Sequence, residues 1–169
     1  MEQLIEKLEK ELREAAEGKE TPISFLRVVI SALQWTSVGY FSALRLAGMK
    51  LGKRVGEGSE KTEISLVLEE LKRIIIALKG GKVELEILPG AKGAEFKIYD
   101  SPTMAEIPNV LQNLCFFEEG FIEGYIDGVI TKNGSLAIAG TSLSVSETSV
   151  EEKRCVGLGD DYCGFLIKF

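Results

Sequence analysis

The last twenty residues, VEEKRCVGLGDDYCGFLIKF (150–169), contain two of the three cysteines in this chain of 169 residues. Cys155 and Cys163 have seven residues between them, and Gly157 and Gly159 lie in that interval together with two aspartates. A glycine-rich interval of this kind between two apolar runs predicts a turn that joins antiparallel strands. If both cysteines lie near the ends of the paired strands, their sulfur atoms can approach each other.

Upstream of this hairpin, the spacing of apolar residues changes between the helical and the strand period. Recurrence every three or four residues predicts helices over 2–17, 21–54, 61–78 and 116–130, the second with a break near 35–39. Alternation predicts a β-hairpin over 82–99 and strands near 136–138, 143–145, 150–156 and 163–169. This order of elements predicts an α+β fold, in which an antiparallel sheet has helices packed on one side.

The chain length suits one domain with a short appendage. We expect residues 1–20 to form an N-terminal helical extension and residues 21–169 to form the domain. The helix over 2–17 has a narrow apolar stripe on an otherwise charged surface. It either packs on the edge of the domain or makes a dimer contact.

The composition excludes several classes of function. The chain has no histidine, which excludes Ser-His-Asp and Cys-His catalysis and every metal site that needs imidazole. A net charge of −6 argues against binding to nucleic acid or to acidic membranes. We expect no membrane span, because no apolar run is long enough, and no signal peptide, because the first residues are charged throughout. An odd number of cysteines without a regular framework makes the cytoplasm the expected location.

Three glycines, Gly120, Gly124 and Gly128, recur every four residues within the helix predicted over 116–130. Each interior glycine costs a helix about 1 kcal/mol relative to alanine, so three on one face suggest a specific role. Either the bare face packs closely on the sheet, or it leaves volume for a ligand.

A local basic cluster consists of Arg45, Lys50, Lys53 and Arg54. It is either the solvated end of a helix or a contact for an acidic partner.

The cysteines allow three interpretations. With Cys115 and a nearby carboxylate, Cys155 and Cys163 could complete a closed, structural zinc site. The alternatives are a disulfide, which a cytoplasmic location disfavours, and buried free thiols that act as small apolar residues. Glu152 offers an oxygen ligand, but on a regular strand Glu151 would share the face of Cys155 instead.

Two segments carry a resemblance to a known family. The segment CFFEEGFIEG (115–124) and the segment EEKRCVGLGDDYCGFLI (151–167) resemble the 4-vinyl reductase domain, whose C-terminal signature is a glutamate, a cysteine three residues later, a Gly-Asp turn and a second cysteine. The resemblance covers residues 20–169. It implies an α+β fold shared with the ligand-binding domains of haem nitric-oxide sensors and with Golgi-transport tethering subunits.

The resemblance also implies a metal site and a dimer. In sensory members of the family, three cysteines and a glutamate hold a structural zinc ion. Carried onto this sequence, the ligands are Cys115, Glu152, Cys155 and Cys163, so the resemblance selects Glu152 over Glu151. Domains of this family are often homodimers, and we expect dimerisation through the first long helices.

The function that follows is a free-standing binding or sensory module for a hydrophobic small molecule. The residues expected to line an apolar pocket are aromatic and aliphatic: Trp35, Tyr40, Phe41, Leu44, Phe117, Phe121 and Tyr125. Aromatic residues at helical spacing are also what an ordinary core requires. The resemblance implies two alternatives, a component of a vinyl or tetrapyrrole reductase system and a dimeric scaffold similar to vesicle-tethering subunits. The absence of a nucleotide-binding loop and of an open metal position argues against catalysis.

Overall fold

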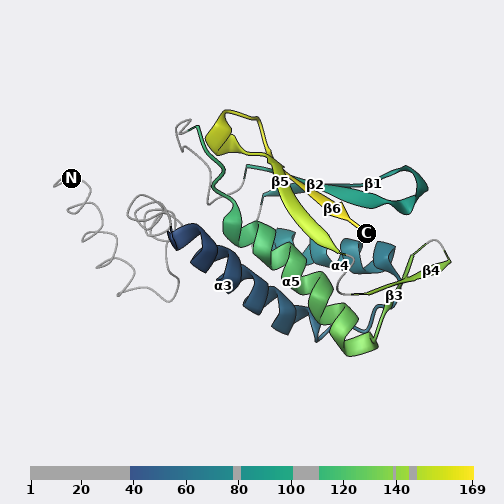
Figure 1. Ribbon diagram of the computed structural model, residues 1–169. Coiled ribbons are helices and arrows are strands. Elements are labelled where there is room, and N and C mark those ends of the chain that lie inside the picture. Colours follow the sequence, from purple (N-terminus) through teal and green to yellow (C-terminus); the bar gives the residue numbers. More distant parts are fainter. Residues whose placement is uncertain (1–38, 78–80, 101–110, 139, 145–147) are drawn as a thin grey trace.

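The computed structural model describes residues 39–77, 81–100, 111–138, 140–144 and 148–169 (Figure 1). The predicted N-terminal extension over 1–20, the helix over 2–17, the first part of the helix over 21–54 and Trp35 lie outside these residues. The domain boundary expected near residue 20 therefore stays a prediction.

The described residues form an α+β structure, as predicted. The helices are α3 (Gly39–Gly56), α4 (Ile64–Ala77) and α5 (Phe116–Asn133). The strands are β1 (Lys82–Ile87), β2 (Gly93–Tyr99), β3 (Leu136–Ile138), β4 (Thr141–Leu143), β5 (Ser149–Arg154) and β6 (Cys163–Lys168). Short 3-10 turns, η1 (Pro89–Ala91) and η3 (Val156–Leu158), join β1 to β2 and β5 to β6.

Four strands form the main sheet, in the order β1-β2-β6-β5, and every neighbouring pair is antiparallel. The two predicted hairpins are therefore adjacent, with the C-terminal strand β6 paired to β2 at the centre. The strand expected near 143–145 ends at Leu143 as β4, and it pairs with β3 in a separate two-stranded ribbon.

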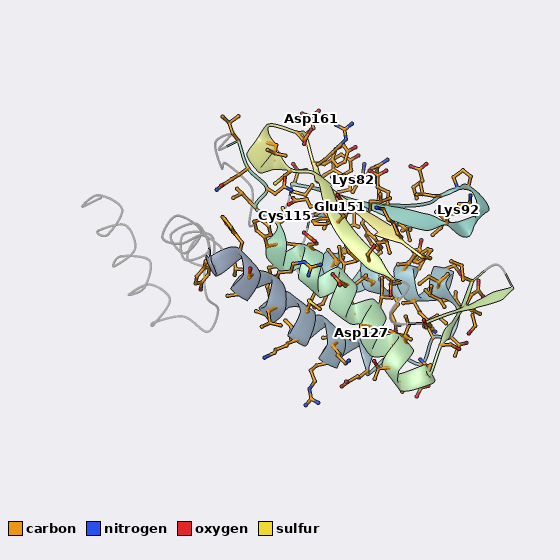
Figure 2. The ribbon with its side chains drawn as sticks, in the orientation of Figure 1. Lys82, Lys92, Cys115, Asp127, Glu151 and Asp161 are labelled. Atoms are coloured by element: carbon orange, nitrogen blue, oxygen red, sulfur yellow. The ribbon has the colours of Figure 1, made fainter. Side chains whose placement is uncertain are left out.

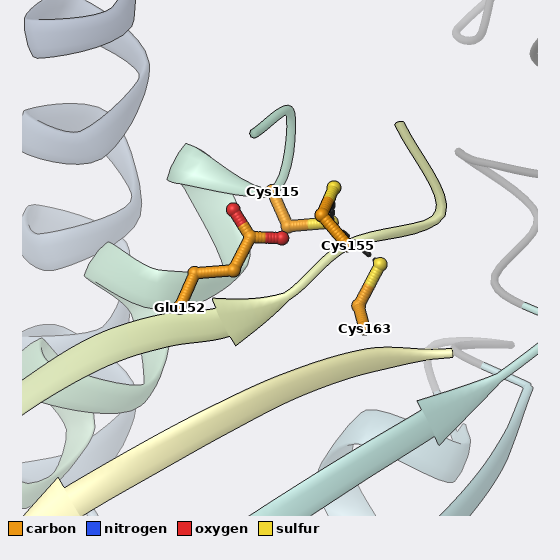
Figure 3. A group of neighbouring side chains, drawn as sticks. All are labelled: Cys115, Glu152, Cys155 and Cys163. Atoms are coloured by element: carbon orange, nitrogen blue, oxygen red, sulfur yellow. Dashed lines mark hydrogen bonds between the residues drawn. The ribbon is translucent and has the colours of Figure 1, made fainter. Parts of the chain in front are cut away.

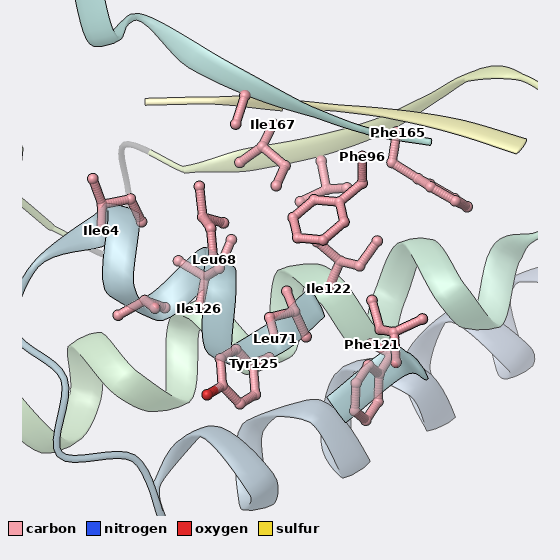
Figure 4. Close-up of a cluster of buried hydrophobic side chains, with 14 of the residues drawn as sticks. Ile64, Leu68, Leu71, Phe96, Phe121, Ile122, Tyr125, Ile126, Phe165 and Ile167 are labelled. Carbon is pink, nitrogen blue, oxygen red and sulfur yellow. The ribbon is translucent and has the colours of Figure 1, made fainter. Parts of the chain in front are cut away.

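The hydrophobic core lies between one face of the sheet and the helices α4 and α5 (Figure 4). Alternate residues of the strands point into it, as the period of two requires. Phe96 on β2 is opposite Phe165 on β6, and neither side chain is exposed. The other face of the sheet carries charged residues, which matches the prediction that helices cover one side only.

Helix α5 is buried on two sides, because α3 lies beside it on the side away from the sheet (Figure 1). The two helices run in parallel, since Gly48 faces Phe117 and Gly56 faces Tyr125. A methyl group placed on Gly124 would lie 2.1 Å from the carbonyl oxygen of Met49. Two sets of glycines approach the partner helix in this way, Gly48, Gly52 and Gly56 on α3 and Gly120, Gly124 and Gly128 on α5.

The glycine face of α5 therefore packs closely, but the predicted partner was wrong. The face contacts α3, not the sheet, and backbone atoms of α3 fill the volume that the second interpretation reserved for a ligand. Contacts between small residues spaced by four allow two helix backbones to approach closely, as they do in membrane helices.

Ion pairs flank this contact. Arg45 on α3 binds Glu119 at 3.1 Å and also Glu123, both on α5. Lys53 binds Asp127, which is labelled on α5 in Figure 2, at 2.9 Å. Arg54 also pairs with Glu57, at 3.8 Å, so three members of the predicted basic cluster are paired within the chain.

Candidate metal centre

A β-bulge in β5 brings Glu152 and Cys155 to the same side of the strand. The pairing of β5 with β6 shifts by one residue after Glu152, so Lys153 is the additional residue of the bulge. Glu152 is 6% exposed and Cys155 is fully buried, whereas Lys153 is exposed. The argument from a regular strand, which placed these two positions on opposite sides, was therefore wrong.

Glu151, the alternative ligand, lies on the opposite side. Its side chain is exposed and makes ion pairs with Lys153 and with Lys168, the latter at 3.5 Å. Glu151 is therefore not part of the buried group.

Cys115 reaches the same place from a different part of the chain. It is the residue before the first turn of α5, and its carbonyl accepts a hydrogen bond from Glu119 N–H at 2.9 Å. The turn after β5 packs directly on the residues before Cys115, because a methyl group on Gly157 would lie 2.6 Å from the carbonyl oxygen of Gln112. The positive end of the α5 dipole favours negative charge at this position.

Together these elements bring four potential ligands into one buried group (Figure 3). One donor atom from each of Cys115, Glu152, Cys155 and Cys163 lies within 4.8 Å of every other. Cys115 Sγ is 2.8 Å from Cys163 Sγ and 3.9 Å from Cys155 Sγ. Sulfur atoms around one tetrahedral zinc ion are about 3.8 Å apart, because each Zn–S bond is about 2.3 Å. The donor separations are therefore within about 1 Å of those that a single cation requires.

The structure favours a different cysteine pair for a disulfide from the one that the hairpin suggested. All three cysteines are free and buried, and the nearest sulfur to Cys163 is that of Cys115, not that of Cys155 across the hairpin. A disulfide would therefore link the start of α5 to β6.

The carboxyl group of Glu152 is the unusual member of the group. Both of its oxygen atoms are buried, and neither has a hydrogen-bond partner in the part of the chain that the structure describes. Burial raises the pKa of Glu152 to about 9, and the negative charge of Cys155 contributes to the increase. A buried carboxyl group without a partner destabilises a fold unless a cation or a donor is present.

Cys155 is the sulfur best suited to carry negative charge. Hydrogen bonding with Cys115 and Cys163 lowers the pKa of the Cys155 thiol, whereas hydrogen bonding with Cys155 and Cys163 raises the pKa of Cys115. The N–H groups of Leu114 and Gly157 also donate to Cys155 Sγ, at 3.3 and 3.4 Å. Donors of this kind stabilise a thiolate.

The donor set fits a structural zinc ion. Three sulfurs and one carboxylate oxygen fill the four positions that zinc prefers, and no protein ligand would remain to be supplied. The unpartnered carboxyl group of Glu152 is the observation that distinguishes this arrangement from a cluster of buried free thiols, which would have no need of a buried acid.

Apart from Trp35, which is outside the described residues, the residues expected to contact a ligand lie on α3 and α5. Tyr40, Phe41, Leu44 and Phe117 are partly buried, whereas Phe121 and Tyr125 belong to the core. The Phe41 ring is 4.5 Å from the Phe116 ring, centroid to centroid, where the two helices begin.

Tyr125 also takes part in a polar group that the sequence did not indicate. Its hydroxyl donates to Glu70 on α4 at 2.9 Å, and the hydroxyl of Ser59 donates to the same carboxylate oxygen. Through this carboxylate, Ser59 joins the segment after α3 to α4 and α5. The pair Ser59 and Glu70 has no sequence motif that would have identified it.

Among the described residues, no helix combines the length and the apolar composition needed to cross a membrane.

Comparison with known proteins establishes the fold relationship. No protein-family model matches the chain. A protein of Methanocaldococcus jannaschii, described as uncharacterised, is 28% identical over 100 residues, which is 59% of this chain and 52% of that protein. This match spans about half the length of the relative.

Solved structures match over more of the chain. The phenol-responsive sensory domain of the transcription activator PoxR, with phenol, has a TM-score of 0.62 and 19% identity, over 87% of this chain and 74% of that chain. A vinyl-4-reductase family protein from Methanocaldococcus jannaschii has a TM-score of 0.52 and 20% identity, over 96% of this chain and 92% of that one.

Two further structures have the same fold. A trafficking protein particle complex subunit 3 from Naegleria fowleri, covalently bound to palmitic acid, has a TM-score of 0.54 and 17% identity, over 86% of this chain and 93% of that one. An H-NOX protein from S. oneidensis in the Fe(II)NO state has a TM-score of 0.52 and 15% identity, over 89% and 77%. The fold relationship implied by the resemblance is confirmed.

Proposed function

We propose that this chain is a binding or sensory domain for a hydrophobic small molecule, and that a structural zinc ion stabilises it. Cys115, Glu152, Cys155 and Cys163 would hold the ion, which links the start of α5 to β5 and β6. The observation that carries the proposal is the buried carboxyl group of Glu152, which lies among three sulfurs with no other partner in the described structure.

The role of the metal would be structural and not catalytic. A closed site leaves no position for substrate or water, so the ion contributes folding free energy and performs no reaction. The chain segments that it joins are far apart in sequence but adjacent in the fold (Figure 3).

The metal and the proposed ligand region share the first turn of α5. Cys115 is followed directly by Phe116 and Phe117, and Phe117 stacks on Phe121 with ring centroids 6.3 Å apart. We therefore place the ligand near the starts of α3 and α5, where these aromatic residues lie with Phe41. Two proteins of the same fold hold phenol and palmitic acid, which supports an apolar ligand for this one.

A matched pair of substitutions tests the metal centre. Glu152→Gln removes the charged ligand, and Glu151→Gln changes the exposed neighbour as a control. In protein refolded with zinc, we expect one bound ion per chain for the wild type and for Glu151→Gln, and much less than one for Glu152→Gln, by elemental analysis. In metal-free protein the two variants should melt within a few degrees of each other, because the carboxyl group then has no cation to bind. Equal zinc content in all three proteins would refute the assignment of Glu152.

A second experiment tests ligand binding. Trp35 is the only tryptophan, and the sequence predicts that it lines the pocket, so its fluorescence serves as the reporter. We expect saturable changes on titration with phenol or palmitate, and weaker binding after Phe117→Ala, while Tyr162→Phe on the outer side of the sheet serves as a control. A linear, non-saturating response to both probes would exclude these two ligand classes, and unchanged binding in Phe117→Ala would move the site elsewhere.

We also propose that the domain is a homodimer in the cytoplasm. Helix α3 exposes two leucines, Leu46 at 51% and Leu51 at 49%, and contact with a second copy would bury apolar surface of this kind. Reduced thiols suit the reducing conditions of that compartment. Light scattering should give twice the chain mass for the wild type and the single chain mass for Leu46→Glu; a wild-type monomer would refute the dimer.

A further inference from the structure

The turn between β5 and β6 holds both backbone groups of Cys155. Asp160 Oδ2 accepts a hydrogen bond from Cys155 N–H at 2.9 Å, and Asp160 N–H donates to the Cys155 carbonyl at 3.2 Å. Leu158 N–H donates to the same carbonyl at 2.9 Å. Because Cys155 is fixed on both sides of its Cα atom, the direction of its Cα–Cβ bond is fixed as well.

The second carboxylate oxygen of Asp160 is also held. Asp160 Oδ1 is 3.3 Å from Arg154 Nη1, and the Arg154 guanidinium lies 5.7 Å from the centre of the Tyr162 ring. The Tyr162 ring in turn packs against Tyr99 on β2, with centroids 5.1 Å apart. Asp160 is therefore supported from the outer face of the sheet, on the side opposite the sulfurs.

The next residue provides a natural comparison. Asp161 has the same side chain and is exposed at the outer end of the turn (Figure 2). None of the hydrogen bonds to Cys155 described above comes from Asp161. Adjacent aspartates thus differ in whether they contact the backbone of the cysteine.

We propose that Asp160 is a positioning residue for the sulfur of Cys155. It orients this ligand before the metal is bound, and Arg154 holds Asp160 in place. The proposal rests on the proposed metal centre. Two ligands of that centre then differ in how well they are oriented without metal. The backbone of Cys155 is fixed by its own turn, whereas the carboxyl group of Glu152 has no partner in the described structure to orient it.

The proposal predicts a loss of metal affinity in Asp160→Ala. Removing a group that orients a metal ligand typically weakens binding roughly 10- to 100-fold. Asp160→Asn keeps an oxygen that can accept the Cys155 N–H, so it should recover much of that loss. Asp161→Ala should bind like the wild type.

The test measures cobalt(II) binding to the full chain in competition with a coloured chelator. The near-ultraviolet absorption of the cobalt–thiolate bonds is a second readout, because it responds to the direction of the sulfur ligand. A role in stability alone would lower the melting temperature and leave both the affinity of the folded protein and this absorption unchanged. If Asp160→Ala does not fold, as judged by circular dichroism, Asp160→Asn decides the question through its absorption band and its affinity.

Each outcome is decisive. Weaker binding and an altered band in Asp160→Ala, with recovery in Asp160→Asn and none of these effects in Asp161→Ala, would support the role of Asp160. A wild-type affinity and spectrum in both Asp160 variants would overturn it and leave the metal centre intact. A wild-type chain that binds no cobalt and no zinc would overturn the metal centre itself, and the role of Asp160 with it.

Discussion

The contact between α3 and α5 can be tested by adding a single methyl group. In Gly124→Ala, the new Cβ atom would lie 2.1 Å from the carbonyl oxygen of Met49 and 2.7 Å from the Met49 Cα. An ordinary contact at this position would be 3.4 Å or more, so the helices would have to separate by about 1 Å. The obstructing atoms belong to the backbone, so no side-chain rotation can relieve the overlap.

The expected net effect is a loss of about 3 kcal/mol in the free energy of unfolding. Overpacking costs about 1–3 kcal/mol, and the upper end applies because two backbones must move. Widening the neighbouring contacts by about 1 Å forfeits part of their attraction, which adds about 1 kcal/mol. Alanine returns about 1 kcal/mol through its higher helix propensity.

Urea unfolding of zinc-replete protein, followed by circular dichroism, would measure the change. The control is Ala47→Gly on the exposed side of α3, which should cost about 1 kcal/mol through propensity alone. Relative to glycine, alanine should therefore stabilise the exposed position 47 and destabilise the buried position 124. A Gly124→Ala variant as stable as the wild type, or more stable, would refute the close approach of the two backbones.

Three other results are expected. Tyr125→Phe removes a hydrogen-bond donor to the Glu70 carboxylate and should cost about 1–3 kcal/mol in urea unfolding; no measurable loss would mean that the bond contributes nothing. Burial raises the pKa of Glu70, but hydrogen bonds from Ser59 and Tyr125 outweigh it and leave the pKa below 4.5. The contribution of Glu70 to stability is therefore complete above the unfolded-state pKa, and it is lost as the pH falls through the lower folded-state pKa. Glu70→Gln should therefore reduce the change in the urea midpoint as the pH falls below about 4.5, and an unchanged slope would contradict this. Lys53→Met should leave the urea midpoint nearly unchanged, because the ion pair of Lys53 with Asp127 is partly exposed to solvent. A clearly lower midpoint would show that the pair is stronger than solvent exposure allows.

Local periodicity was sufficient to predict the class of the fold. The alternation in 82–99 and 150–169 predicted two hairpins, and both form, because one face of each strand is buried and the other is wet. The helix over 61–78 is present as α4, shorter at its start. The periodicity of apolar residues does not indicate which element packs against a given helix face. We therefore predicted that the glycine face of α5 packs on the sheet, whereas it packs on α3.

The candidate site was harder to predict, because it depends on a local irregularity. Strand geometry alone placed Glu152 on the wrong side, and only the resemblance selected it. The bulge at Lys153 places Glu152 on the same side as Cys155. No residue in EEKRC predicts a bulge there, because a bulge depends on how the partner strand pairs. Asp160 was visible only as part of a turn, and its contact with the Cys155 backbone required coordinates.

The interlocking of α3 with α5 restricts how these helices can move. Each glycine accommodates a carbonyl group of the opposite helix, so a slide by one or two residues would drive side chains into backbone atoms. The next register that restores the fit lies four residues along, about 6 Å away at 1.5 Å per residue. A small movement of α3 along α5 is therefore blocked. A displacement that begins at the starts of the two helices, near Phe41 and Phe116, must move both helices together as a rigid body relative to the sheet.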